Sequence, residues 1–199
     1  MKKKIKKILN KKNKSKIICL TSYSKNIAEE ADKYADIILV GDSLGSVLYN
    51  YDTTKKVTLT NMIDHSKSVR LGVKKSLMVV DMPYKTYNST RTALKNAKKI
   101  MKETRCDAVK LEGGKEIINQ IKFLKKNKIP VMGHLGLLPQ TNKGKFKSKG
   151  KTENEKKQLI DDSILLQKNG VFSIVLECVK TSTAQQITQK LKSPTIGIG

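Results

Sequence analysis

Short apolar runs alternate along the chain with longer stretches whose apolar residues recur every three or four positions. The apolar runs span residues 17–20, 37–40, 77–80, 108–111, 130–132, 173–176 and 195–198. The stretches between them have helical periodicity, as Ala93, Ala97 and Ile100 illustrate. Because repeated strand-then-helix units form parallel sheets, the pattern predicts an α/β protein with seven strands.

The N-terminal segment differs from the rest of the chain by its lysine content. Residues 1–16 carry nine lysines, and Ile5, Ile8 and Leu9 have the spacing of an amphipathic helix. Such a helix could bind a membrane surface or a partner, but packing against the chain's own domain is the favoured interpretation. We therefore expect a basic helix or extension over residues 1–15, followed by one α/β domain over residues 16–199.

The charge of the chain raises the possibility of nucleic-acid binding. The 199 residues include 41 Lys and Arg against 17 Asp and Glu, which gives a net charge of +24. Only three of the basic residues are arginines and aromatic residues make up 5%, whereas nucleic-acid sites depend on arginine forks and aromatic stacking. We interpret the lysines as solvated surface and expect no nucleic-acid partner.

Membrane and disulfide signals are weak in this sequence. No apolar run approaches the roughly 20 residues that a membrane helix needs, and no apolar segment of a secretory signal follows the basic N-terminus. The three cysteines form no C-x-x-C pair, so neither a disulfide framework nor a zinc site is indicated. We expect a cytoplasmic protein without a membrane partner.

An acidic residue stands at the end of four apolar runs: Asp42, Asp81, Glu112 and Glu177. The C-terminal ends of parallel strands meet at one edge of a sheet or one mouth of a barrel, where ligands usually bind. Helix capping by Asp would explain one or two of these residues but explains the glutamates poorly. We expect the four carboxylates to lie together.

A cluster of ionised carboxylates indicates a bound cation, because without one the negative charges repel one another. The oxygen ligands, the lack of a cysteine pair and the presence of only two histidines favour Mg²⁺ over Zn²⁺. One acid would then remain available as a base.

Three further polar residues stand at the same strand ends. Ser43 follows Asp42 in a Gly-Asp-Ser-Leu-Gly turn, Lys110 lies two residues before Glu112, and His134 is expected at the end of the fifth strand, two residues after the fifth run. Residues two apart on a strand point to the same face, so Lys110 should lie among the carboxylates. His134 could polarise or hydrogen-bond a substrate oxygen.

Six motifs follow one another in a distinctive order: VGDSLG (40–45), VVDMPY (79–84), VKLEGG (109–114), GHLGLLPQ (133–140), VLECV (175–179) and PTIGIG (194–199). In this order and spacing they closely resemble ketopantoate hydroxymethyltransferase, from about Lys16 to the last residue. The resemblance implies a TIM (β/α)₈ barrel enzyme of pantothenate biosynthesis. Such an enzyme transfers a hydroxymethyl group from 5,10-methylenetetrahydrofolate to 3-methyl-2-oxobutanoate through a Mg²⁺-stabilised enolate, forming 2-dehydropantoate.

The resemblance also implies roles for individual residues. The residues that match metal ligands are Asp42, Asp81 and Glu112. The residue that matches the proton-abstracting base is Glu177. The residues that match substrate contacts are Asp42, Ser43, Asp81, Lys110 and His134. The implied partners are the keto acid, the folate co-substrate and further copies of the chain, because family members form homo-oligomers, a decamer in the resembled family.

The sequence departs from the family in three places. Serine occupies position 24 where members commonly have aspartate, the loop after the fifth run is short and lysine-rich, and the chain stops at Gly199. A barrel of this type typically needs about 250 residues. We therefore expect a barrel truncated after its seventh strand, with its C-terminal part missing, weakly stable and poorly active alone.

Three other functions are compatible with parts of the pattern. A Mg²⁺-dependent, enolate-forming lyase or mutase of the phosphoenolpyruvate mutase and isocitrate lyase type would share the strand-end carboxylates, but the VGDSLG and GHLGLLPQ motifs favour the transferase. A basic nucleic-acid-binding protein would bind duplexes with a steep salt dependence. An inert fragment would have no function of its own.

Overall fold

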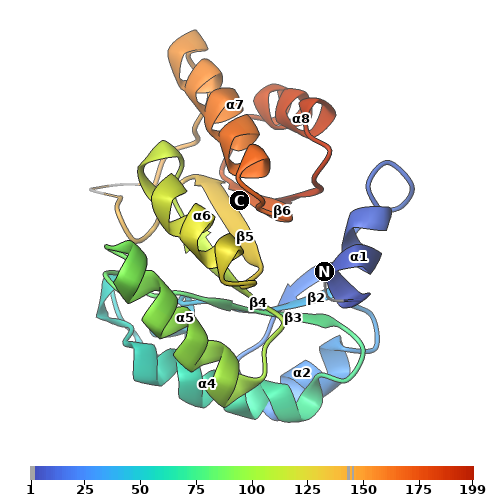
Figure 1. Ribbon diagram of the computed structural model, residues 1–199, viewed down its shortest axis with the longest axis vertical. Helices are drawn as coiled ribbons and strands as arrows, with labels where there is room; N and C mark the ends of the chain where they lie inside the picture. Colours follow the sequence, from blue (N-terminus) through green and yellow to red (C-terminus); the bar gives the residue numbers. More distant parts are fainter. Residues whose placement is uncertain (1–2, 143, 145) are drawn as a thin grey trace.

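Seven parallel strands curl into a nearly closed barrel with helices on its outside (Figure 1). The computed structural model describes residues 3–142, 144 and 146–199. Each strand pairs with the next along the chain, in the order β1 to β7. The strands are β1 (Cys19–Thr21), β2 (Ile37–Val40), β3 (Leu77–Asp81), β4 (Ala108–Glu112), β5 (Val131–Gly136), β6 (Ser173–Glu177) and β7 (Thr195–Ile198). The expected TIM-like fold and all seven strand positions are confirmed.

The helices follow the strands in regular alternation. They are α1 (Lys3–Asn10), α2 (Lys25–Ala31), α3 (Leu44–Tyr49), α4 (Leu59–Gly72), α5 (Thr90–Thr104), α6 (Ile118–Lys126), α7 (Glu153–Lys168) and α8 (Thr181–Lys190), with short 3₁₀ turns η1 (Thr54–Lys56) and η2 (Lys115–Ile117). Local chemistry fixes several ends. Thr58 and Thr152 form capping boxes with Asn61 and Glu155, and Gly170 follows α7 with a φ of 98°.

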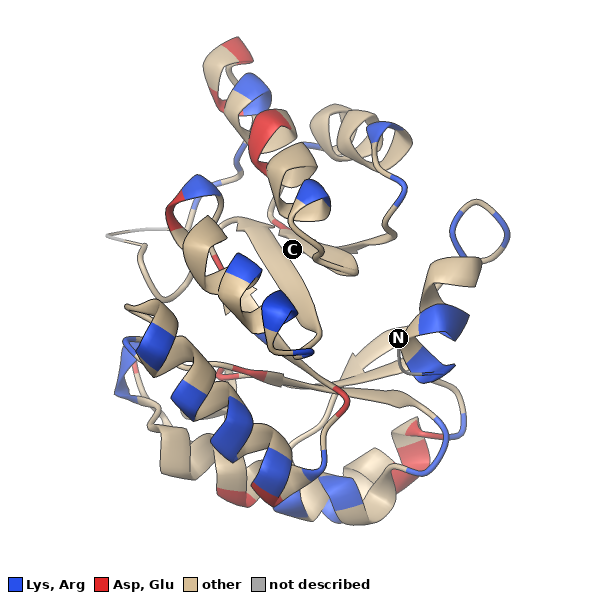
Figure 2. Ribbon diagram, viewed as in Figure 1, with Lys and Arg blue, Asp and Glu red and all other residues tan. Residues whose placement is uncertain are grey.

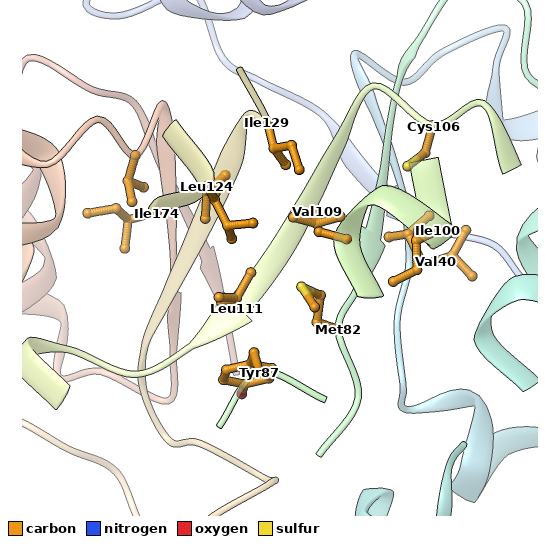
Figure 3. Close-up of a cluster of buried hydrophobic side chains, with 14 of the residues drawn as sticks. Val40, Met82, Tyr87, Ile100, Cys106, Val109, Leu111, Leu124, Ile129 and Ile174 are labelled. Atoms are coloured by element: carbon orange, nitrogen blue, oxygen red, sulfur yellow. The ribbon is translucent and has the colours of Figure 1, made fainter. Parts of the chain in front are cut away.

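Alternation along the strands gives the barrel two apolar cores. Outward-facing residues such as Val40, Val109 and Leu111 pack against the helices, together with Ile100 of α5 (Figure 3). Inward-facing residues form a second cluster inside the barrel: Ile37, Leu39, Leu77, Val79, Ala108, Met132, Val175 and Ile196. Because strand side chains alternate between faces, the residues that continue the inward rows at the C-terminal strand ends must also face the interior.

The helix α1 closes the barrel at the N-terminal end of the strands. Its Ile5 and Ile8 are each 1% exposed and belong to the interior cluster rather than to the outer one. Lys4 Nζ donates to the Ser76 carbonyl oxygen at 2.7 Å, and Lys11 pairs with Asp36 at 2.6 Å. The amphipathic pattern therefore serves the chain's own core, as its favoured interpretation predicted.

The connection after β2 is more ordered than its sequence suggests. Residues 46–59 lack a clear period and read as a long loop, yet α3 and η1 occupy much of the connection. Gly45 permits this compact path, because a Cβ at that position would lie 2.6 Å from Val57 Cγ2 and 3.2 Å from the Tyr51 ring. This packing between distant positions overrides the weak local signal.

Basic side chains are spread over the outside of the molecule. Figure 2 shows Lys and Arg distributed over the outer helices, among them α4, α5 and α6. Within the described part of the chain, no helix has both the length and the apolar character that crossing a membrane requires.

A buried carboxylate joins α2 to the loop that precedes β3. Asp32 accepts backbone N–H hydrogen bonds from Lys74, Lys75 and Ser76 at 2.8–3.2 Å. Burial acts to raise the pKa of Asp32, but the hydrogen bonds from Ser76 and its neighbours outweigh burial and lower the pKa to about 2. The ionised side chain therefore stabilises the fold at the end of the barrel opposite the strand-end carboxylates.

Replacing Asp32 with Asn is expected to lower the free energy of unfolding near neutral pH by about 1–2 kcal/mol, allowing for solvent screening. Because the folded-state pKa lies below the ordinary value, this contribution is present above about pH 4 and is lost as the pH falls toward 2. Urea unfolding at neutral pH and near pH 3 measures the change. Asp64→Asn, at an exposed position of α4, is the control, and equal effects of the two substitutions would contradict the prediction.

Candidate active site

The strand ends bring the predicted polar residues together at one mouth of the barrel. Asp81 is in register with Lys110, and Glu112 is in register with His134. Glu177 of β6 is in register with Gly136 of β5. Asp42, just after β2, donates its backbone N–H to Asp81 Oδ2 at 3.1 Å. The four carboxylates therefore lie on neighbouring parts of one ring, as their strand-end positions predicted.

A line of charged groups crosses this ring. Lys110 Nζ lies 3.1 Å from Asp81 Oδ2 and 3.3 Å from His134 Nδ1. On the other side of the imidazole, Nε2 lies 3.1 Å from Glu177 Oε2, although this nitrogen makes no hydrogen bond of good geometry. Glu112 Oε1 lies 3.5 Å from His134 Nδ1. The imidazole thus lies between two carboxylates and one ammonium group.

Burial makes these charges strongly dependent on one another. Burial, followed by the charge of Asp81, raises the pKa of Asp42 to about 7. Burial also raises the pKa of Asp81, although the Lys110 ammonium opposes it. For Lys110, burial acts to lower the pKa, but the charges of Asp81, Glu112 and Asp42 outweigh burial and raise it. The lysine therefore stays protonated among the carboxylates.

His134 and Glu112 stabilise each other's charged forms. Burial and the nearby ammonium act to lower the pKa of His134, but the carboxylates of Glu112 and Glu177 outweigh them and raise it. For Glu112, burial acts to raise the pKa, and the contacts with His134 and Lys110 outweigh burial and lower it. Glu112 is therefore ionised at neutral pH.

The donor set is suitable for a hard cation. Across residues 3–142, 144 and 146–199, no three His, Cys, Asp or Glu side chains converge closely enough to hold a metal ion as they stand. However, Asp81 Oδ1 is buried without a hydrogen-bond partner. Three carboxyl groups, those of Asp81, Glu112 and Asp42, also act on the single Lys110 ammonium group. Unpaired buried carboxylate oxygens are the ligands that Mg²⁺ prefers, so Asp42 and Asp81 fit such an ion, with Glu112 beside them.

Ser43 lies at the rim of this cluster rather than inside it. Its side chain is exposed, and its hydroxyl group lies 2.8 Å from the Tyr23 hydroxyl. Burial raises the pKa of Tyr23, and the charges of Asp81 and Asp42 raise it further. The hydrogen bond to Ser43 acts in the opposite direction but does not outweigh burial. Tyr23 therefore belongs to the mouth of the barrel. Sequence reasoning missed it because no pattern distinguishes it from other loop tyrosines.

Gln140 and Tyr87 are two more site residues that sequence reasoning did not single out. Gln140 is 1% exposed and Tyr87 is 8% exposed, and they hydrogen-bond to each other at 2.5 Å. Gln140 also hydrogen-bonds to Asp42 and Glu112. Its place at the end of the GHLGLLPQ motif was the available signal, but a glutamine in a polar loop does not by itself indicate burial.

A separate cavity of about 470 Å³ lies at the opposite end of the strands. Lysines 11, 12, 14 and 16 line it together with Thr188 and Thr195. Ligands of parallel α/β barrels bind at the C-terminal strand ends, and none of the four clustered carboxylates lines this cavity. We therefore do not assign it to the chemistry of the site.

Comparison with known protein families identifies the chain. The family described as ketopantoate hydroxymethyltransferase matches residues 2–199. The chain belongs to the ketopantoate hydroxymethyltransferase family. Within this family, the protein named 3-methyl-2-oxobutanoate hydroxymethyltransferase from Pelagibacter ubique (strain HTCC1062) is 64% identical over 199 residues, covering 100% of this chain and 77% of the relative. The protein of the same name from Anaplasma marginale (strain St. Maries) is 46% identical, covering 95% of this chain and 69% of the relative.

Solved structures of low sequence identity share the fold of this ketopantoate hydroxymethyltransferase family member. Phosphonopyruvate hydrolase, solved in a complex with oxalate and Mg²⁺, aligns with a TM-score of 0.72 at 8% identity, covering 98% of this chain and 71% of that chain. A 2,3-dimethylmalate lyase of the PEP mutase/isocitrate lyase superfamily aligns with a TM-score of 0.70 at 13% identity, covering 99% and 72%. At these identities the likeness establishes the barrel fold alone.

Replacing Lys110 with Met is expected to lower the free energy of unfolding by about 3–5 kcal/mol, because buried carboxylates then lose their paired cation. Added Mg²⁺ should raise the melting temperature of this variant more than that of the unaltered chain, since the ion replaces the missing positive charge. Thermal unfolding with and without Mg²⁺ measures both effects. Lys122→Met, on the exposed face of α6, is the control; a similar loss in both variants would refute the pairing.

Proposed function

We propose that this chain transfers a hydroxymethyl group from 5,10-methylenetetrahydrofolate to 3-methyl-2-oxobutanoate, forming 2-dehydropantoate. The observation that carries the proposal is the strand-end cluster, in which Glu177 lies 3.1 Å from the buried His134 imidazole and that imidazole in turn contacts the Lys110 ammonium group. Family membership supports the reaction class, since the family and a relative that matches the whole chain are named for this transfer. The lyase and mutase alternative has only the shared fold in its favour.

The proposed metal is Mg²⁺, held by Asp42 and Asp81 with Glu112 beside them. The unpartnered Asp81 oxygen and the excess of carboxylates over ammonium groups support this assignment. A structurally similar hydrolase has been solved with Mg²⁺ and oxalate, a small dicarboxylate. When bound, such a cation withdraws electron density from the carbonyl group of a keto acid, which makes the neighbouring C–H bond more acidic.

Glu177 is the proposed base that removes the proton from C3 of the keto acid. Its side chain is 19% exposed, whereas those of Asp81, Lys110, Glu112 and His134 are 2–5% exposed. A base must touch its substrate, so exposure favours Glu177 over the buried acids. Its contact with His134 is not a directed hydrogen bond, which leaves the carboxylate free to turn toward a substrate in the mouth.

Lys110 and His134 are the proposed stabilisers of negative charge on the substrate oxygens. The raised pKa of Lys110 keeps it positively charged, and its position is fixed by Asp81 before any substrate arrives. Preorganised donors of this kind contribute about 3 kcal/mol each in comparable sites. Water breaks both C–N bonds between the one-carbon unit and the folate, which releases tetrahydrofolate and leaves the carbon as formaldehyde. Once the substrate proton has moved to Glu177, the carbanionic carbon forms the new C–C bond to this carbonyl carbon, and the resulting alkoxide takes up a proton to become the hydroxymethyl group. Ser43, at the rim, is a proposed further substrate contact.

Three parts of the proposal concern the surroundings of the site. The folate is the proposed co-substrate, because a one-carbon donor is needed to supply the new carbon. A homo-oligomer and a cytoplasmic location stay predictions, as does the absence of a nucleic-acid partner. The presence of Lys and Arg on several outer helices, rather than on one helix alone, supports the last of these (Figure 2).

Replacing Glu177 with Gln is expected to slow proton exchange at C3 of 3-methyl-2-oxobutanoate by about 100-fold or more, since general bases contribute at least that much. Binding of the keto acid should persist, because glutamine preserves the shape of the side chain. Proton NMR of the keto acid in D₂O with Mg²⁺ follows the exchange, and calorimetry follows the binding.

The matched control for this experiment is Glu153→Gln, since the Glu153 side chain is 88% exposed and lies outside the cluster. That variant should exchange the proton as the unaltered chain does. Exchange at an undiminished rate in Glu177→Gln would refute the assignment of the base. A complete absence of exchange in the unaltered chain would instead count against the proposed function.

A further inference from the structure

Gln140 connects three strand ends through one buried side chain. It lies in the connection between β5 and α7 and is 1% exposed. Its Nε2 donates to Asp42 Oδ2 at 2.7 Å and to the Met82 carbonyl oxygen at 3.0 Å, and its backbone N–H donates to Glu112 Oε2 at 3.1 Å. One loop residue therefore holds a carboxylate after β2 and another at the end of β4.

Tyr87 fixes the orientation of the Gln140 amide. The Tyr87 hydroxyl group donates to Gln140 Oε1 at 2.5 Å, whereas its other acceptor, the Glu112 carbonyl oxygen, is at 3.4 Å. With Oε1 taken by this donor, both Nε2 protons have acceptors. A flipped amide would set Oε1 against a carboxylate and a carbonyl oxygen, which is unfavourable in a buried site. Only one orientation of the Gln140 amide gives its oxygen a donor and both of its N–H groups an acceptor.

A tight turn presents the Gln140 backbone to Glu112. The N–H groups of Thr141 and Asn142 both donate to the Leu138 carbonyl oxygen, at 3.1 and 2.8 Å. These bonds close the turn on itself and leave the Gln140 N–H directed toward the barrel mouth. The position of Glu112 thus depends on the path of this loop as well as on β4.

We propose that Gln140 is a positioning residue that aligns Asp42 and Glu112 for binding a divalent cation, and that Tyr87 acts through Gln140. The role rests on the proposed use of these two carboxylates around the metal. Gln140 donates one hydrogen bond to each of them, at Asp42 Oδ2 and Glu112 Oε2, and does not engage their other oxygens. Outer hydrogen-bond partners of this kind fix the direction of metal-ligating oxygens, and their loss typically costs 10-fold to 100-fold in metal affinity.

The first test measures Mn²⁺ binding by electron paramagnetic resonance, with Mn²⁺ as a probe for Mg²⁺. Gln140→Met removes the side-chain hydrogen bonds while preserving side-chain length and the backbone N–H. We expect its Mn²⁺ affinity to fall by about 10-fold to 100-fold. The matched control is Gln120→Met, because Gln120 donates to the Tyr87 carbonyl oxygen at 3.2 Å but contacts neither carboxylate. An unchanged affinity in Gln140→Met, or an equal loss in both variants, would overturn the proposal.

A double-substitution cycle tests whether Tyr87 acts through Gln140. Tyr87→Phe alone should weaken Mn²⁺ binding, because the amide then loses the donor that orients it. In the Gln140→Met background, Tyr87→Phe should cause no further loss, since no amide remains to orient. Additive losses would mean that Tyr87 affects the carboxylates independently, and would overturn that part of the proposal.

Nitrogen-15 NMR of the side-chain amides tests the same arrangement without metal. In the unaltered chain the two Gln140 Nε2 protons should give separate signals that exchange slowly with solvent, and Tyr87→Phe should speed that exchange. Fast exchange in the unaltered chain would overturn the positioning role. If the unaltered chain bound no Mn²⁺ while these protons were protected, the metal assignment of the proposed function would fail and the hydrogen-bonded positioning of Asp42 would stand.

Discussion

The confinement of several carboxylates around one buried ammonium group is the constraint on which the active site depends. Charges leave water only when paired or hydrogen-bonded. Lys110 meets part of this requirement through its 3.1 Å contact with Asp81, and backbone and amide donors meet another part at Asp42 and Glu112. What remains is an excess of negative charge and one unpartnered oxygen. The arrangement therefore favours a divalent cation at a place that the fold itself determines.

The two apolar cores determine where the charged groups lie along the barrel axis. The inward faces of the strands form an apolar floor beneath the charged groups, and α1 closes that floor from the other end with Ile5 and Ile8. The outward faces anchor the strands to the helices. Because the packed floor excludes water from below, electrostatic interactions above it are stronger than they would be at an exposed surface. The apolar pattern of the strands therefore contributes directly to the chemistry.

The two ends of the barrel use buried carboxylates in opposite ways. At the N-terminal end, Asp32 accepts hydrogen bonds from several backbone N–H groups and its pKa falls to about 2. Its ionised side chain therefore stabilises the contact between α2 and the loop that precedes β3. At the C-terminal end, Asp42 has fewer donors and its pKa rises to about 7, so its charge is open to a cation or a proton. At Asp42 burial and the charge of Asp81 dominate, whereas at Asp32 the backbone hydrogen bonds outweigh burial.

The sequence alone determined the strand and helix alternation, the strand ends and the identity of the strand-end acids, because side-chain period and motif spacing are local properties. It also determined the family, through motifs distributed over most of the chain. Only the tertiary structure decided that α3 and η1 order the connection after β2, where Gly45 allows close packing. Only the tertiary structure brought Tyr23, Tyr87 and Gln140 to the site. Their hydrogen bonds join residues 20 to 98 positions apart, and no periodicity in a sequence encodes which distant polar groups will meet once the strands curl into a barrel.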